Sequence, residues 1–381
     1  MSVRNNGSSD CEPRNYVRGR NGRRPEPAVA IENVCAWPNL TLLQDGTVVA
    51  VIHNQPGHLM RPADVECWAS EDGGRTWTKR GTPAPRDNAR AARANVAAGL
   101  AGNGDLIVIA SGWADPTAEG RGGILRPIVS RSADGGRTWE INAGAFAGDW
   151  PKTARRESSP EGYLIPFGDI IVGKDGRLRV GMYGSNPGGT YVYSSPDDGR
   201  TWREPVPISE DAVIHEPALF HLGEGRWLAA ARLDGLDLYF SDDDAASWVR
   251  RGALTGRKQH PGHFMRLEDG RLILAYGDRS NRSKKGDRVL RRRSIEVLFS
   301  GDEGESWSKP LRIADVKGDC GYPSTVQLPD GRALTGYYGQ TELSFDREGF
   351  PERVAYRMEV VAWDPAASSG TIDSASGECP Q

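Results

Sequence analysis

The octapeptide SEDGGRTW at 70–77 decides the fold, because its pattern Ser-x-Asp-x-Gly-x-Thr/Ser-Trp recurs along the chain. Complete copies follow at 132–139 (SADGGRTW), 195–202 (SPDDGRTW) and 300–307 (SGDEGESW). A degenerate copy lies at 241–248 (SDDDAASW), with Ala245 where glycine is expected. A repeat at this spacing predicts an architecture assembled from similar supersecondary units.

The octapeptide has the composition of a hairpin turn. Its Asp can accept hydrogen bonds from amides of its own turn, Gly takes a positive φ, and Thr or Ser adds a side-chain bond. The closing Trp is expected to pack between neighbouring sheets, where its N–H finds a partner. We therefore interpret the motif as structural and do not count its aspartates as active-site carboxylates.

A second element recurs between the octapeptides, in which two apolar runs are joined by a tight polar-glycine turn. Six such β-hairpins lie at 40–51, 96–110, 170–182, 218–231, 263–276 and 324–337. Five are followed by an octapeptide, whose flanks supply two further strands. Four strands in each of six units predict an all-β fold, a six-bladed β-propeller with four-stranded antiparallel blades.

The remaining segments set the limits of this domain. The strand-like run at 354–363 is expected to close the ring by joining the sheet of an end blade. The propeller then spans 29–364, with tails expected to be disordered at 1–28 and 365–381. A β-sandwich would not need six similar hairpins, and no long stretch has the 3.6-residue period of a helical fold.

Composition excludes several kinds of partner. The net charge is -3, from 48 basic and 51 acidic residues, which favours neither nucleic acid nor an anionic membrane. No apolar run is long enough to span a bilayer, and residues 1–28 lack the apolar stretch of a secretory signal, so we expect a cytoplasmic protein. Five cysteines without a CxxC pair argue against a disulfide scaffold and a zinc site. We expect free thiols. A disulfide between Cys35 and Cys320 is the alternative, because their blades should meet where the ring closes.

Octapeptides of this kind, each after an apolar hairpin, resemble the sialidase superfamily of glycoside hydrolases over about residues 30–363. In a propeller the first strand of each blade lines the central channel, so the segment before each hairpin should face the pocket. These segments are rich in groups that bind ligands or do chemistry, and lie at 36–39, 93–95, 161–163, 215–217, 260–263 and 321–324.

The resemblance implies a catalytic set. Tyr322 stands before the last hairpin, as the family's nucleophile does, and Glu216 in HEPALF is similar to the segment that carries its partner base. Asp64 lies six residues before Ser70, the spacing of the family's general acid. A carboxylate can take the proton of a phenol, which is a poor nucleophile when neutral. A buried structural tyrosine and a surface salt bridge remain the alternatives for Tyr322 and Asp64.

The resemblance also implies arginines that clamp a substrate carboxylate. Arg232 matches the second of three, unless it only pairs with Glu216, and Arg293 matches the third, unless it belongs to a solvated basic loop. The first is missing, because the matching stretch reads Ala36-Trp37-Pro38. Lys or Trp does not reproduce a bidentate guanidinium. The other candidates for substrate binding around the pocket are Arg61, Arg93, Trp37, Asn39, His260 and His263.

The leading hypothesis is therefore a retaining exo-glycosidase that removes a terminal, acidic sugar such as sialic acid. The histidine-rich rim and the missing arginine also fit a polysaccharide lyase or rhamnosidase-type propeller. A propeller that only binds glycan or protein is the third hypothesis. No metal or cofactor is implied, since two histidines in HPGH are a weak metal signal. The expected partner is a carbohydrate, and the oligomeric state is not predicted.

Overall fold

The computed structural model describes residues 16–116, 122–146, 150–152, 155, 157, 159–184, 189–209, 214–280, 283–285, 288–290, 293–316, 318–341, 344–345, 351–353 and 355–368. These residues form strands and connecting loops, without an α-helix and so without any helix that could cross a membrane.

Most strands belong to antiparallel runs of four, paired in the order of the sequence. The first sheet contains β2 (Cys35–Leu42), β3 (Val48–His53), β4 (Val65–Ser70) and β5 (Thr78–Ala84). Two further runs are β6 (Ala91–Leu100), β7 (Leu106–Ala114), β9 (Ile128–Ser132) and β10 (Glu140–Asn142), then β11 (Ile165–Val172), β12 (Leu178–Tyr183), β13 (Thr190–Ser195) and β14 (Arg203–Ser209). Parallel pairing of β6 with β11 joins these two runs into one nine-stranded sheet, which includes the short β8 (Gly123–Ile124) beside β7.

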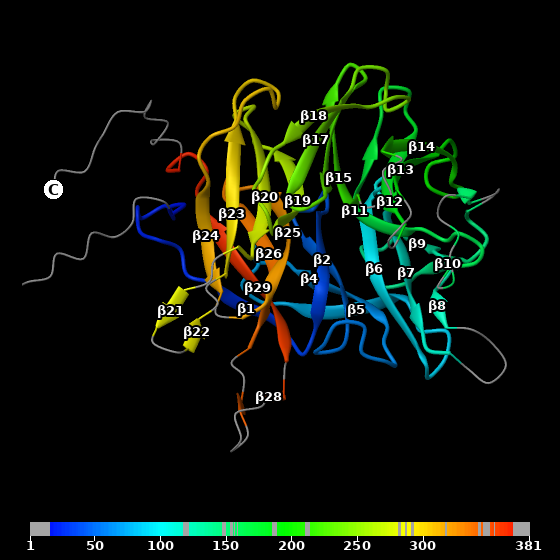
Figure 1. Ribbon diagram of the computed structural model, residues 1–381, viewed down its shortest axis with the longest axis horizontal. Helices are drawn as coiled ribbons and strands as arrows, with labels where there is room; N and C mark the ends of the chain where they lie inside the picture. The colour runs from blue at the N-terminus through cyan, green and yellow to red at the C-terminus, as the bar shows by residue number, and fades with distance from the viewer. Residues whose placement is uncertain are drawn as a thin grey trace, which may run out of the picture.

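Three more four-stranded sheets complete the main body. They are β15 (His215–Gly223), β16 (Arg226–Arg232), β17 (Leu236–Ser241) and β18 (Val249–Ala253); β19 (Gln259–Arg266), β20 (Leu272–Asp278), β23 (Arg293–Ser300) and β24 (Leu311–Val316); and β25 (Cys320–Gln327), β26 (Ala333–Gln340), β29 (Tyr356–Trp363) and β1 (Ala28–Glu32). The small hairpins β21 (Ser283–Lys285) with β22 (Arg288–Leu290), and β27 (Ser344–Phe345) with β28 (Pro351–Arg353), extend away from the ends of the sheets (Figure 1).

The first strands of these units lie beside one another in the centre of the molecule. Strand β2 contacts β6, β6 contacts β11, and the series continues through β15, β19 and β25, which contacts β2 again. All six predicted hairpins are present as the first two strands of the units. The all-β architecture of four-stranded antiparallel sheets is consistent with the predicted propeller.

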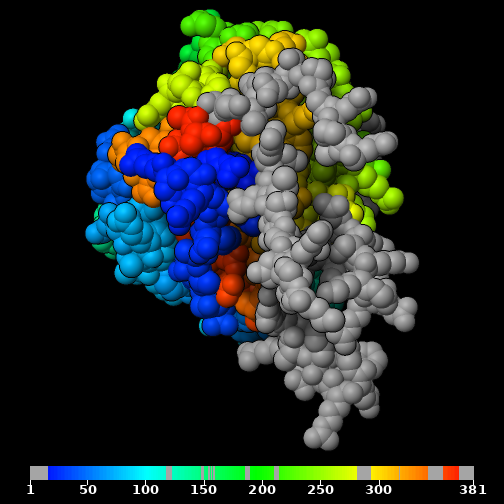
Figure 2. All heavy atoms as spheres, turned by 90° about the vertical axis from the view of Figure 1, so that its left-hand side faces the viewer, coloured from blue at the N-terminus to red at the C-terminus, as the bar shows by residue number. Residues whose placement is uncertain are grey.

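The last sheet combines strands from the two ends of the chain. As expected, the segment at 354–363 joins an end sheet, where β29 lies between β26 and β1. The pairing of β1 with β29 was not anticipated from the sequence, nor was the position of residues 16–28, assigned above to a tail. Val17 is fully buried and the Arg18 amide donates to the Ser368 hydroxyl at 3.1 Å. Figure 2 shows this blue segment beside red atoms near the C-terminal end; residues 1–15 and 369–381 lie outside the described residues.

The octapeptides form turns between the third and fourth strands, as their composition predicts. Asp72 accepts hydrogen bonds from the amides of Arg75 and Thr76, both at 2.9 Å, and from the Thr76 hydroxyl at 2.7 Å. The bonds from Thr76 lower the pKa of Asp72 to about 2. Trp77 Nε1 donates to the Gly74 carbonyl at 3.1 Å. The box carboxylate is therefore fully used by its own turn.

The degenerate copy keeps this turn without glycine. Ser247 donates its amide and its hydroxyl to Asp243, at 2.9 and 2.6 Å, while Ala245 holds a φ of 68°. One bond is lost, because Trp248 Nε1 is buried without a hydrogen-bond partner among the described residues. The copy has thus diverged in sequence more than in shape.

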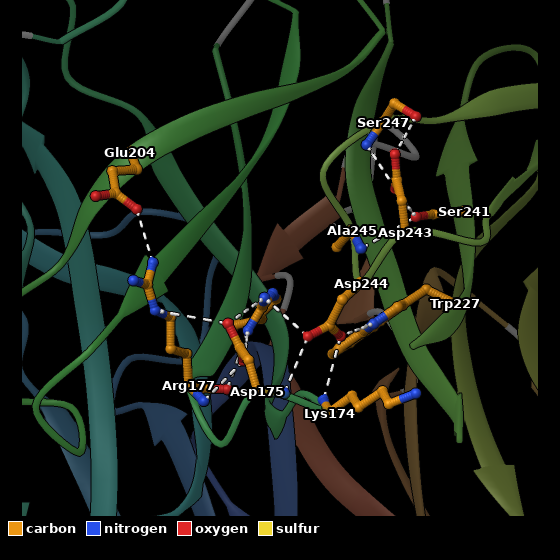
Figure 3. A network of polar contacts seen from close by, with 11 residues as sticks. Lys174, Asp175, Arg177, Glu204, Trp227, Ser241, Asp243, Asp244, Ala245 and Ser247 are labelled. Carbon is orange, nitrogen blue, oxygen red and sulfur yellow. Dashed lines mark hydrogen bonds and ion pairs between the residues drawn. The ribbon is translucent and has the colours of Figure 1, made fainter. Parts of the chain in front are cut away.

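Asp244, the fourth residue of this octapeptide, links its unit to the preceding one. Its carboxylate accepts hydrogen bonds from Trp227 Nε1 at 2.8 Å and from the amides of Lys174 and Asp175 at 3.2 and 3.1 Å (Figure 3). Asp198 makes the same kind of link for the preceding unit, where it accepts from the Gly102 amide at 2.6 Å. Acidic residues of the boxes therefore hold sheets together at the end where the hairpin turns lie.

At the opposite end, each first strand begins with an irregularity. The pairing register shifts near the start of all six first strands, as in Cys35/Asn39, His215/Ala218 and Gly321/Ser324. Such bulges re-aim side chains and are common beside active sites. Several residues within them have positive φ, including Trp37 (57°), Glu216 (48°) and Tyr322 (52°). The sequence places its catalytic candidates at these bulges.

Candidate active site

Tyr322 and Glu216 meet in the centre of the molecule. Tyr322 lies in β25 and Glu216 in β15, and the phenol donates a hydrogen bond to Glu216 Oε1. Both are buried, with 9% and 3% of their surface exposed. Burial, reinforced by the negative charge of Glu216, raises the pKa of Tyr322 well above its usual range. Tyr322 is therefore neutral at pH 7, with a carboxylate in place to accept its proton.

Arg232 completes this pair from the end of β16. Its Nη1 donates to Glu216 Oε2 at 3.0 Å, so the carboxylate binds a phenol through one oxygen and a guanidinium through the other. Burial would raise the pKa of Glu216, but Arg232 and the Tyr322 hydroxyl outweigh it and lower that pKa. About a third of the Arg232 side chain remains exposed, at 34%. Part of the Arg232 guanidinium is therefore open to solvent beside Tyr322 and Glu216.

A second guanidinium, Arg279, was not among the residues selected from the sequence. It follows β20 directly, its Cζ lies 5.7 Å from the centre of the Tyr322 ring, and its Nε donates to the Cys320 carbonyl at 2.7 Å. The signal that identifies it is positional, because Arg232 also stands at the end of the second strand of its unit. Arg279, directly after AYGD (275–278), could therefore have been predicted from the sequence in the same way as Arg232, at the end of 226–232.

Aromatic rings form one wall around Tyr322. Trp37 lies edge-on to it with ring centres 5.9 Å apart, and Tyr338 lies 5.8 Å away. His58 packs between Trp37 at 5.7 Å and Tyr356 at 5.0 Å. Burial and the nearby charge of Arg279 lower the pKa of His58 to about 4. The wall is uncharged at pH 7 and occupies the region where the sequence lacks an arginine.

His260 contributes a second neutral imidazole. It lies in β19 and is buried, with 6% of its surface exposed. Burial and the charge of Arg232 lower its pKa to about 3, although Glu216 acts in the opposite direction. Arg232 and Arg279 are thus the cations that act on Tyr322 and Glu216 in the described site.

Asn39 and His263, predicted to bind substrate, contact neighbouring chain segments. Asn39 Nδ2 donates to Asp169 Oδ1 at 3.0 Å, and His263 Nε2 lies 3.1 Å from Asp169 Oδ2 and 3.3 Å from the Ser324 hydroxyl. This cluster joins four units through β2, β11, β19 and β25. A cavity of about 20 Å³ between it and Trp37, Phe167 and Tyr322 has room for about one water molecule.

The three other predicted arginines each have an acidic partner. Arg61 Nη2 lies 2.6 Å from Asp115, and Arg93 Nη2 lies 2.8 Å from Asp87 while its Nη1 donates to the Arg126 carbonyl at 2.7 Å. Arg293 forms an ion pair with Asp319. None of these contacts reaches Tyr322 or Glu216, so neither Arg61 nor Arg93 takes the place of the missing arginine.

Asp64, predicted as the general acid, lies in the loop between β3 and β4. Its Oδ1 accepts from the Arg86 amide at 2.7 Å and its Oδ2 from the Arg86 guanidinium at 2.8 Å. These contacts form the salt bridge that was the alternative interpretation of this residue. Asp64 is therefore held by Arg86, while the Tyr322 hydroxyl is held by Glu216.

The segment at 161–163 is displaced from the predicted position. Strand β11 begins at Ile165, after this segment, and Phe167 lies 6.1 Å from the Tyr322 ring instead. Tyr163 packs edge-on against Trp150, with ring centres 5.6 Å apart.

Three of the five cysteines lie among the described residues. Cys35, Cys67 and Cys320 are buried free thiols, so Cys35 and Cys320 do not pair, while Cys11 and Cys379 lie outside the described residues. Burial raises the pKa of Cys320 to about 12. In the described chain no cluster of three or more His, Cys, Asp or Glu side chains could hold a metal ion.

The family assignment comes from a model of the BNR repeat-like domain, which matches residues 46–335. The chain belongs to this family. The match covers all the octapeptides and most of both strands that carry Tyr322 and Glu216. Together with its structural neighbours, it places the chain in the sialidase-like BNR-repeat superfamily. A search of functionally curated proteins finds no match to this BNR-repeat chain.

Solved structures share the fold of this BNR-repeat chain at low sequence identity. A protein of unknown function from Dyadobacter fermentans is 20% identical with a TM-score of 0.69, and the match covers 90% of this chain and 99% of that one. The NanB sialidase from Streptococcus pneumoniae is 12% identical (TM-score 0.65, 90% and 71% covered). Trypanosoma rangeli sialidase is 16% identical (TM-score 0.61), and the match covers 91% of this chain but 56% of that protein. At such identities the likeness shows a common fold.

Proposed function

We propose that the chain is a retaining exo-glycosidase of the sialidase type, built as a six-bladed propeller, that removes a terminal acidic sugar. The observation that carries the proposal is the buried hydrogen bond between Tyr322 and Glu216, with guanidinium groups on both sides. A phenol paired with a carboxylate can act as an activated nucleophile. Sialidases are the glycosidases that use tyrosine in this way. The cyclic contacts of the first strands support six blades.

In the proposed mechanism, Glu216 takes the proton of Tyr322 as the phenolate oxygen attacks the anomeric carbon. The bond to the leaving oxygen breaks while that oxygen receives a proton from Asp64. Asp64, now a carboxylate, takes a proton from a water molecule, whose oxygen then displaces Tyr322 from the anomeric carbon. Tyr322 recovers its proton from Glu216. Each of the two displacements inverts the configuration at the anomeric carbon. The product therefore has the same configuration as the substrate.

The role of Asp64 requires a change in its contacts. Both carboxylate oxygens accept hydrogen bonds from Arg86, so proton transfer requires that Asp64 exchange at least one of them for the leaving oxygen of the substrate. The proposal therefore predicts that a bound glycoside separates Asp64 from the Arg86 guanidinium. A complex with an uncleaved substrate analogue tests this directly.

The charge around the site favours a substrate with one acidic group. Arg232 donates a hydrogen bond to Glu216 through Nη1 and keeps a partly exposed guanidinium that can bind a carboxylate. His58, which is exposed, and Trp37, which is 9% exposed, offer aromatic contacts for the apolar side of a sugar ring, while Tyr338 is buried and packs against His58. Sialic acid, other nonulosonic acids and uronic acids share these requirements.

The test is release of fluorophore from glycosides of sialic acid, related nonulosonic acids, uronic acids and neutral sugars, with Tyr322→Phe alongside. Turnover of an acidic glycoside that the variant loses supports the proposal. A product with new near-ultraviolet absorbance from an acidic polysaccharide would instead identify a lyase. If sugars bind equally to both proteins without turnover, the pocket is a binding site and the glycosidase proposal is wrong.

A further inference from the structure

Arg279 is placed differently from Arg232 in relation to the catalytic pair. Arg232 binds the carboxylate of Glu216, whereas Arg279 binds the chain that carries Tyr322. Its Nε donates to the carbonyl of Cys320, two residues before Tyr322 on β25, at 2.7 Å. Its Nη2 donates to the Tyr338 hydroxyl on the paired strand β26, at 3.2 Å. One guanidinium thus spans the two strands that support the tyrosine.

The backbone around Tyr322 is shaped to receive this guanidinium. Gly321 has a φ of 150°, and a methyl group there would collide with Arg279 Nη2. Gly277, near the end of β20, lies so close to β25 that an added Cβ would be 3.0 Å from the Gly321 Cα. Two glycines therefore allow the end of β20 to approach β25 closely enough for Arg279 to lie over the Tyr322 ring.

Tyr322 itself needs such support, because its φ of 52° is a left-handed conformation that non-glycine residues adopt at a cost in free energy. A residue in such a conformation remains there only where its surroundings hold it. The other contacts of the Tyr322 ring are with the rings of Trp37, Phe167 and Tyr338. Arg279 is the group that combines hydrogen bonds to this region of the sheet with a contact to the ring face.

We propose that Arg279 is a positioning residue, which fixes the Gly321–Tyr322 turn so that the phenol points at Glu216. This inference rests on the proposed function, because it assigns Arg279 a role in the reaction of Tyr322. It differs from a role in substrate binding, since Arg279 directs its Nε and Nη2 at the Cys320 carbonyl and the Tyr338 hydroxyl. It also differs from a general structural role, because its hydrogen bonds go to the two strands that hold the nucleophile, and its Nε lies 3.8 Å from Asp319, directly before β25.

The first experiment compares Arg279→Lys with Arg266→Lys. Lysine keeps the charge but cannot donate from two fixed nitrogens of one plane. Arg266 is a matched control, since its Cζ lies over Phe220 at the same 5.7 Å, it is ion-paired with Glu303 at 2.8 Å, and it stands at the box end of β19. Displacement of a reacting group by about 1 Å can cost about 10²-fold in rate. We expect kcat to fall by about 10²-fold in Arg279→Lys, with KM unchanged, and neither to change in Arg266→Lys.

Tyr338→Phe removes one of the two hydrogen bonds and keeps the ring beside Tyr322. We expect kcat to fall in the same direction as in Arg279→Lys, by a smaller factor, and KM to stay constant. If Arg279→Lys raises KM and leaves kcat unchanged, Arg279 binds substrate and the positioning role is wrong. A lower unfolding temperature with full kcat in the folded enzyme would overturn it as well.

A second readout does not depend on turnover. In protein labelled with 3-fluorotyrosine, the ¹⁹F resonance of Tyr322 is assigned by its loss in Tyr322→Phe. We expect this resonance to move in Arg279→Lys and to stay in place in Arg266→Lys. If the wild-type protein cleaves no glycoside but the resonance moves, the proposed function fails and the positioning contact stands. If the wild-type protein is active and Arg279→Lys changes neither the resonance nor kcat, the positioning proposal fails.

Discussion

Left-handed backbone occurs at both ends of the sheets, but different residues occupy it. In the complete octapeptides the position before the x-Thr/Ser-Trp sequence is always glycine, with φ of 86–94° at Gly74, Gly136, Gly199 and Gly304. At the entrances of the first strands, Gly168 and Gly321 have positive φ, but so do Ala36, Trp37, Glu216 and Tyr322, with φ of 47–57°. Glycine adopts this conformation without strain, while other residues are strained in it by about 1–2 kcal/mol.

The difference shows what each end of the sheet requires. The box turn needs a backbone shape, so the residue without a side chain serves best. The entrance needs a particular side chain at a particular angle, and the strain remains because Trp, Glu and Tyr cannot be replaced by glycine without losing their groups. Strained residues also occur in the box turns, at Asp198, Asp244 and Glu303, whose carboxylates bind neighbouring segments. At both ends, strain therefore accompanies a side chain that makes a specific contact. The predictions below test this contrast.

The largest expected effect is on activity, from Tyr322→Phe. Phenylalanine keeps the ring contacts with Trp37 and Tyr338 but removes the hydroxyl that donates to Glu216. We expect kcat to fall by about 10³-fold or more, and the protein to lose about 1–3 kcal/mol of stability, since the buried Glu216 carboxylate loses one hydrogen-bond donor. Steady-state kinetics and urea unfolding measure the two quantities. Full activity in the variant would remove Tyr322 from the mechanism.

The second expected effect is a difference in the pH dependence of stability between the pocket end of the sheets, which carries His260, and the box end, which carries Asp72. The pKa of His260 is lowered from 6.5 to about 3, because its side chain is buried. Since the unfolded chain binds a proton at His260 that the folded chain does not, stability should fall as pH drops below 6.5 until this lowered value is reached. Asp72 at the box end has its pKa lowered from 3.8 to about 2, so its contribution is lost only below pH 3.8.

Urea unfolding of wild-type protein and His260→Gln between pH 7 and 4.5 measures this difference. We expect the stability of the variant to decline less over this range, by about 1 kcal/mol or more. Asp72→Asn is the matched control, because its effect should be constant above pH 4.5. Parallel declines of wild type and His260→Gln would show that His260 does not titrate in this way.

A third, smaller effect concerns glycine at the box end. In Gly304→Ala the new Cβ would lie 2.8 Å from Leu228 Cδ1 at a φ of 88°, so contact and backbone strain add. We expect about 2 kcal/mol of destabilisation, with kcat unchanged in the folded protein. Gly270→Ala isolates the strain, because its φ is 90° and no atom lies within 4 Å of the added Cβ. Equal losses in the two variants would mean that the contact with Leu228 relaxes freely.

The smallest expected effect is that of Ala245→Gly in the degenerate octapeptide. Glycine relieves the strain of a φ of 68°, but it removes a methyl group that is 2% exposed and makes the unfolded chain more flexible. These effects are of about 1 kcal/mol each and opposite in sign, so we expect a change of about 0.5 kcal/mol or less. A larger gain in unfolding temperature would show that strain, and not packing, dominates at this turn.

The sequence predicted the repeated elements because each is local. An octapeptide closes its own turn through Asp72 and Thr76, and a hairpin pairs residues close in the chain, so composition suffices. Tyr322, Glu216 and Arg232 could also be selected from the sequence as candidates, because each occupies a fixed position relative to a hairpin. Arg279 was missed because its partners, Cys320 and Tyr338, lie on another unit. The contacts of Asn39 and His263 with Asp169 were not predicted for the same reason, since Asp169 lies on another unit.

The pairing of β1 with β29 has a consequence for how the protein is made. Ala28 lies opposite Val360 and Glu32 opposite Arg357, so the outer strand of the last sheet precedes every other described strand in the chain. Its amides and carbonyls stay unpaired by this partner until β29 has been synthesised. Contacts of such large sequence separation form slowly. Completion of the last sheet therefore depends on a contact between the first and the last of the described strands.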